Sequence, residues 1–298
     1  MLPVKIGLQL SVSPYTWGFE LTPFLITAYF IIMILFSSWC FLKFSKDVAI
    51  GIILFSIFIY FGLTNMPWLP LILIYGLIGF KIGGLKLSLT IIASFLFITF
   101  TGVLPQALLS IYLCGIAVII SFILGSSLGI WAAHNDKVSA FMRPINDTMQ
   151  TMPSFVILIP FVMFFGIGEF TALLAIIAYA FVPAMRYTEH GLRNLPETVI
   201  EAAQMIGCSQ TQLLWKVKIP LAMPVIMLGL NQTIMFGLAM LVIAALVGTT
   251  GLGQLIYIGL SKADFGTGMI SGVSIALIAI IFDRTTQAWR IKLEKKTQ

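Results

Sequence analysis

Residues 107–133 read ALLSIYLCGIAVIISFILGSSLGIWAA and contain no charged side chain. A helix needs about 20 consecutive apolar residues to cross the hydrocarbon core of a bilayer. The segment Ala107–Ala133 is long enough and apolar enough to meet that requirement. It is therefore predicted to be a transmembrane helix.

Small residues recur at every fourth position of this segment: Ala117, Ser121, Gly125, Gly129 and Ala133. That spacing places them on one helix face, where they allow another backbone to approach closely. The partner is either another helix of the same chain or a second subunit. The pattern favours neither interpretation.

The composition extends the membrane prediction to the whole chain. Only 9% of the 298 residues are charged and 59% are apolar, whereas a soluble domain averages about 25% charged residues. The net charge of +6 does not indicate nucleic-acid binding, because Lys and Arg gather in the cytoplasmic loops of membrane proteins. An all-α, polytopic membrane protein is predicted.

About nine spans are predicted on this basis, seven of them clear candidates and two less certain. They are Phe24–Lys43, Val48–Thr64, Trp68–Phe80, Leu87–Val103, Ala107–Ala133, Met152–Gly168, Thr171–Glu189, Leu221–Val247 and Met269–Asp283. Trp68–Phe80 is short, and Met152–Gly168 is interrupted by Pro153 and Pro160. With the N-terminus outside, only Lys5 and Lys262 of the 17 basic residues fall outside. This asymmetry predicts an N-out, C-in, multi-pass protein of a bacterial cytoplasmic (inner) membrane.

The largest polar stretch, Gly191–Lys218, lies inside in this topology. Asn194-Leu-Pro-Glu197 is typical of a helix start, and Gly207 is typical of a helix end. Ser209-Gln-Thr-Gln212 is a second capping-box pattern, and its helix is expected to stop before Pro220. The loop is therefore predicted to be two short helices folded at Gly207.

The first of these helices is expected to expose small and apolar side chains, namely Ala202, Ala203, Met205 and Ile206. Such a surface is useful if it docks on another protein. The alternative interpretation is a helical connector that rests on its own membrane domain.

The loop also resembles a known motif. Glu201-Ala-Ala203, Gly207 and Val217-Lys-Ile219-Pro220 resemble the EAA motif of ABC-importer permeases, which reads E-A-A, three residues, G, nine residues, I-x-L-P. The chain departs from it only at Val217 and Ile219. The resemblance implies a type I ABC-importer permease core whose Glu201–Gly207 helix couples to a separate cytoplasmic ATPase. It assigns the coupling to Glu201, Ala202, Ala203, Gly207, Val217, Ile219 and Pro220.

Further stretches resemble the glycine betaine/proline/choline permease branch between about Ala107 and Ala288. They are Asp147–Ser154, Phe161–Gly168, Pro220–Ile226, Asn231–Thr233 and Gly251–Gln254. The resemblance implies a zwitterionic or quaternary ammonium cargo such as glycine betaine, proline betaine or choline. It divides the chain into accessory helices (1–105), a permease core (106–290) with a coupling loop (191–220), and a cytoplasmic tail (291–298).

The same resemblance implies the partners. They are a second copy of the permease, a cytoplasmic ATPase dimer and an extracytoplasmic binding protein, with no role for nucleic acid. No G-x-x-x-x-G-K-[S/T] loop occurs in the sequence, so ATP and Mg²⁺ are expected on the partner ATPase, with no cofactor on this chain. Gly248–Gly253 is interpreted as a flexible outer loop.

An enzyme is not predicted, and neither is a metal site. The ionisable residues near the spans, Glu169, Arg186, Glu189 and Asp283, map to predicted span ends. Three alternatives stay open: an ion-gradient-driven secondary transporter, a permease for another small polar solute, and a scaffold or sensor without transport.

Several polar or helix-breaking residues are candidates to line a translocation pathway. They are Asn231, Gln232, Thr233, Met152 and Pro153. For the first three, interhelical hydrogen bonding is the favoured alternative. Helix packing explains the other two equally well.

Overall fold

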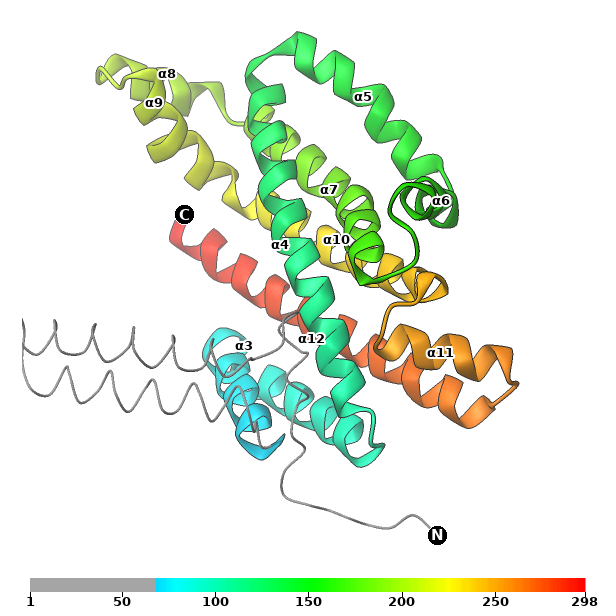
Figure 1. Ribbon diagram of the computed structural model, residues 1–298. Coiled ribbons are helices and arrows are strands. Elements are labelled where there is room, and N and C mark those ends of the chain that lie inside the picture. Colours follow the sequence, from blue (N-terminus) through cyan, green and yellow to red (C-terminus); the bar gives the residue numbers. More distant parts are fainter. Residues whose placement is uncertain (1–67, 298) are drawn as a thin grey trace, which may run out of the picture. The chain divides into compact units, whose positions relative to one another are not determined.

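The computed structural model describes residues 68–297, and every regular element in that range is helical (Figure 1). The α-helices are α3 (Trp68–Phe100), α4 (Leu104–His134), α5 (Asp136–Thr151), α6 (Ser154–Phe165), α7 (Glu169–Arg193), α8 (Glu197–Met205), α9 (Gln210–Gln212), α10 (Ile219–Ala244), α11 (Leu252–Ser261) and α12 (Phe265–Thr297). A π-helical turn (Leu213–Lys218) precedes α10, and a 3-10 turn (Ala245–Val247) follows it. The all-α prediction is confirmed. The expected spans Phe24–Lys43 and Val48–Thr64 lie outside the described residues.

The helix α3 folds back on itself at Gly84, which has φ +76°. A Cβ added at Gly76 would lie 2.9 Å from Ile92 Cγ1, although sixteen residues of straight helix would separate them by about 24 Å. The sequence places a break between Trp68–Phe80 and Leu87–Val103, and the fold-back lies between these two predicted spans.

The helix α7 packs on α4 and α10 and lies at the centre of the helices that follow α3. The small residues of α4 face α7, because a Cβ at Gly125 would lie 2.5 Å from Phe181 O and one at Gly129 would lie 2.6 Å from Met185 O. Ser121 Oγ donates to Ile177 O across the same contact, at 3.3 Å. The small-residue face therefore serves packing within the chain.

By length and composition alone, five helical stretches among residues 68–297 could cross a membrane, or six if the bent pair α5–α6 counts as one span. One of the five is α3, which Gly84 divides into two shorter helices. The predicted span Met152–Gly168 contains a helix shorter than the span itself, α6 (Ser154–Phe165). The helix axis bends by 102° between α5 and α6, where Met152 adopts an extended conformation before Pro153. The helix α6 has 12 residues, about 18 Å of helix against a hydrocarbon core of about 30 Å.

Two further expectations fail around α10. Pro220 does not end the helix before it. The π-helical turn Leu213–Lys218 runs directly into α10, and Pro220 lies in the first turn of α10.

The segment Gly248–Gly253 after α10, interpreted from the sequence as a flexible outer loop, is bound to α4. Leu252 N–H donates to Ser110 Oγ at 2.9 Å, and both Thr249 and Leu252 are buried. The short helix α11, which the sequence analysis missed, begins there.

Candidate functional site

The helix α8 lies at the tip of the loop between α7 and α10. Its N-cap is Pro196, and no side chain caps it. Asn194 lies before this helix and does not cap it, because the Asn194 amide donates back to His190 O at 2.8 Å at the end of α7. Glu197 lies in the first turn of α8, where an acidic side chain is favoured by the helix dipole.

The end of α8 is a Schellman motif. Gly207 N–H donates to Gln204 O at 2.9 Å, and Cys208 N–H donates to Ala203 O at 3.2 Å. Gly207 has φ +87°, and a Cβ there would meet no atom within 4 Å. Glycine is therefore required for its left-handed backbone and not for space. The predicted bend at Gly207 is confirmed.

The tip of this loop exposes two large apolar side chains. Met205 is 89% exposed and Ile206 is 84% exposed, and Ala202 beside them is exposed as well. Ala203 departs from the expectation: it is 7% exposed and faces inward, on the side where α8 packs against the turn Leu213–Lys218. The helix thus rests on its own chain through one face and leaves the opposite face uncovered.

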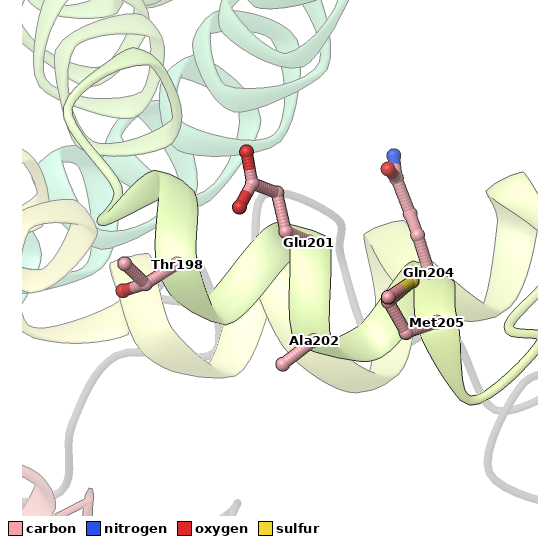
Figure 2. Close-up of a pocket in the computed structure, with 5 residues that line it drawn as sticks. All are labelled: Thr198, Glu201, Ala202, Gln204 and Met205. Atoms are coloured by element: carbon pink, nitrogen blue, oxygen red, sulfur yellow. The ribbon is translucent and has the colours of Figure 1, made fainter.

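A shallow open pocket runs along α8 and is lined by Thr198, Glu201, Ala202, Gln204 and Met205. Figure 2 shows Glu201 and Gln204 projecting to one side of the helix and Ala202 to the other. Within the described part of the chain, the Glu201 side chain makes no hydrogen bond or ion pair. A pocket formed by a single exposed helix does not enclose a small ligand. Its shape suits contact with another macromolecule.

The second arm of the loop holds α8 in place. The capping box at Ser209 is confirmed: Ser209 Oγ accepts from Gln212 N–H at 3.3 Å, and Gln212 Oε1 accepts from Ser209 N–H at 3.1 Å.

Val217 lies in the π-helical turn. Ile219 packs with Leu195 against the buried side chains Leu192, Ala222 and Ile226. Both ends of the loop are therefore anchored on one apolar cluster, with Pro220 exposed beside it.

The candidate pathway residues do not form one group. Asn231 is buried, donates to Asp283 Oδ1 at 2.8 Å and accepts from Thr286 Oγ1 at 2.7 Å, so it links α10 to α12. Thr233 donates within α10, to Gly229 O at 2.8 Å. The two bonds of Asn231 agree with the alternative interpretation, in which this residue forms hydrogen bonds between helices. A pathway role for Asn231, Gln232, Thr233, Met152 and Pro153 stays a prediction.

One cluster at the base of the loop was missed. Arg193, the last residue of α7, bonds to Ala132, Asp136 and Glu189. Two of these partners are far from Arg193 in sequence. The only sign of this cluster in the sequence was the spacing of Glu189 and Arg193, which lie four residues apart on one helix and can therefore form an ion pair.

The sequence of this chain is similar to those of known transport proteins. The family model of binding-protein-dependent transport system inner membrane components matches residues 125–290, more than half of the chain. Glycine betaine/proline betaine transport system permease protein ProW of Escherichia coli (strain K12) is 39% identical over 226 residues, which cover 76% of this chain and 64% of ProW. The chain therefore spans less than two thirds of the length of ProW.

Other relatives cover the chain differently. Glycine betaine transport system permease protein OpuAB of Bacillus subtilis (strain 168) is 36% identical over 255 residues, which cover 86% of this chain and 90% of OpuAB. Trimethylamine N-oxide transport system permease protein TmoV of Pelagibacter ubique (strain HTCC1062) is 42% identical over 226 residues, which cover 76% of this chain and 31% of TmoV.

Among solved structures, an inward-facing conformation of the MetNI methionine ABC transporter aligns with a TM-score of 0.57 at 18% sequence identity. The alignment covers 64% of this chain and 95% of that chain. At this identity, the likeness establishes the fold alone.

Proposed function

Because this chain belongs to the family of binding-protein-dependent transport system inner membrane components, we propose that it is the permease of an ATP-driven importer for a small zwitterionic or quaternary ammonium solute. It is a multi-pass inner-membrane protein. The cargo class rests on ProW, OpuAB and TmoV, whose names specify glycine betaine, proline betaine or trimethylamine N-oxide. Glycine betaine is the cargo to test first.

The observation that carries the proposal is the uncovered tip of α8. Met205 and Ile206 are almost fully exposed on a loop that Gly207 turns back and that Leu195 and Ile219 anchor. Exposed apolar side chains of this size mark interaction sites when they gather on a structured element. We assign this tip to a separate cytoplasmic ATPase, with Glu201 available to bond at the rim of the contact.

The remaining components follow from this coupling. ATP and Mg²⁺ are bound by the ATPase, and this chain carries no cofactor. Two ATPases that close on ATP need two coupling helices, so the permease works as a homodimer together with an extracytoplasmic binding protein. The loop 191–220 and the C-terminus lie inside and the N-terminus outside, with residues 1–105 as accessory helices, 106–290 as the core and 291–298 as the tail.

Reconstitution tests this function. The chain is placed in proteoliposomes with a candidate ATPase and binding protein, and uptake of labelled glycine betaine is measured with ATP, without ATP, and with an ion gradient alone. Uptake that requires ATP supports the importer. Uptake that follows the ion gradient and ignores ATP would overturn it in favour of a secondary transporter. ATP hydrolysis stimulated by another small polar solute, without betaine uptake, would keep the importer and replace the cargo.

A further inference from the structure

The guanidinium of Arg193 joins three helix ends. Nε lies 3.0 Å from Glu189 Oε1 on α7, and Nη1 lies 2.8 Å from Asp136 Oδ1 at the start of α5. Nη2 donates to Ala132 O in the last turn of α4, at 2.7 Å. Each of the three nitrogens thus has a partner on a different helix. We call Arg193 and these partners the Arg193 clamp.

Helix-end chemistry explains why these groups meet. The last carbonyls of α4, which ends at His134, have no partner inside that helix. A cation is favourable at the ends of α4 and α7, and an anion such as Asp136 is favourable at the start of α5. Arginine suits the position because its planar fork presents separate donors, whereas lysine offers a single ammonium group.

The partners of the clamp differ in burial. The Glu189 side chain is 13% exposed, that of Arg193 is 31% exposed, and that of Asp136 is 91% exposed. Buried Ser139 also donates to Glu189 Oε1, at 2.5 Å. Because water screens an exposed pair and leaves it little strength, the Glu189 and Ala132 contacts carry more of the clamp than the Asp136 contact does.

The position of the clamp along the chain suggests its role. Only Asn194, Leu195 and Pro196 separate Arg193 from α8, so a displacement of α8 can reach Arg193 through three residues of chain. We propose that Arg193 is a positioning residue that transmits movement of α8 to the corner between α4 and α5. This inference rests on the proposed function, because it requires an ATPase that moves α8.

The test measures solute uptake per ATP hydrolysed in proteoliposomes that hold the full complex. Arg193→Gln should lower this ratio about fivefold to tenfold. A change of this size is near the low end of the couplings observed between two sites in one protein. ATP hydrolysis and complex assembly should stay near wild type. Arg193→Lys keeps the charge and should lose less. Asp136→Asn is the matched control, and its ratio should change less than about twofold because that pair is exposed.

A double-mutant cycle identifies the contact. If Arg193 acts through Glu189, the double variant Glu189→Gln, Arg193→Gln should be no worse than Arg193→Gln alone. A wild-type ratio for Arg193→Gln would overturn the clamp while leaving the importer intact. A parallel loss of uptake, hydrolysis and melting temperature in both Arg193→Gln and Arg193→Lys would reduce Arg193 to a structural role. A wild-type complex without ATP-driven uptake would overturn the proposed function itself.

Discussion

Glycine serves different purposes in the α4–α7 contact and in the loop that carries α8. At Gly125 and Gly129 it provides space, because a Cβ there would lie 2.5–2.6 Å from carbonyl oxygens of α7. At Gly207 it provides conformation, because φ is +87° and the surroundings are open. The first pair maintains the fold. The third glycine presents an exposed surface that the fold itself does not need.

This difference shows how to separate stability from coupling. A substitution in the α4–α7 contact should destabilise the protein and lower transport only as a consequence. A substitution at the loop tip should lower transport while leaving the membrane domain folded.

Gly129→Leu should have the largest effect on stability. Its side chain would have to displace the Met185 carbonyl, and overpacking of this kind costs about 1–3 kcal/mol or more. The amount of folded protein after detergent extraction and its thermal midpoint should both fall. Gly115→Ala, on the same helix but with no atom within 4 Å of the new Cβ, is the control and should be neutral or slightly stabilising. If both variants behave alike, the contact with α7 does not limit stability.

Thr286→Val tests the link between α10 and α12 and should rank second. The substitution removes the hydroxyl that donates to the Asn231 carboxamide oxygen, and an unsatisfied buried acceptor costs about 1–3 kcal/mol. The midpoint of thermal unfolding should fall, although less than in Gly129→Leu. Thr285→Val is the matched control, because the Thr285 hydroxyl donates only within its own helix. An equal fall in both variants would contradict a specific interhelical link.

Gly207→Ala should destabilise the protein less than Gly129→Leu does, but it should lower solute uptake more directly. A non-glycine residue at this left-handed position costs about 1–2 kcal/mol, and the cost falls on the turn after α8. Solute uptake should drop while the melting temperature of the membrane domain changes little. Gly207→Asn, which tolerates this backbone better, should retain more uptake than Gly207→Ala does. If alanine retains as much uptake as asparagine, the turn is not the reason for glycine.

Asp264→Asn, at the residue just before α12, should have the smallest effect on stability. Hydrogen bonds from the Thr267 hydroxyl and N–H hold the pKa of the Asp264 carboxyl below its usual value. A lowered folded-state pKa gives stability above the unfolded-state pKa of about 3.9 that is lost as pH falls through the folded-state pKa. The melting temperature of wild type should exceed that of Asp264→Asn at neutral pH, and the gap should close under acid. A gap independent of pH would contradict this.

The parts of the structure that depend on local pattern could be predicted. Apolar length and small-residue spacing located α4, and the residues around Gly207 and Ser209 located the folded loop, because caps and turns depend on neighbouring residues. The parts that depend on contacts distant in sequence could not. The inward face of Ala203, the Ser110–Leu252 bond that joins the segment after α10 to α4, and the Arg193 clamp all require groups that the fold brings together.

Proline has different consequences at two positions. Pro153 was predicted to interrupt a span, and it accompanies a bend of 102° between two helices. Pro220 was read as a helix end, yet it lies in the first turn of α10 after a π-helical turn. Proline fixes its own φ and removes one donor, and the surrounding packing decides whether the helix bends or begins there.

The most direct test of the central claim is to place a charge on the exposed tip of α8. Purified complexes of the permease and the ATPase would be compared for Met205→Glu, Ile206→Glu and the control Thr211→Glu, which adds the same charge at an exposed site on the same loop. The account predicts that the first two variants lose the ATPase and ATP-driven uptake while their melting temperatures match wild type, and that the control keeps both. Normal ATPase association and uptake in Met205→Glu and Ile206→Glu would contradict coupling through this loop.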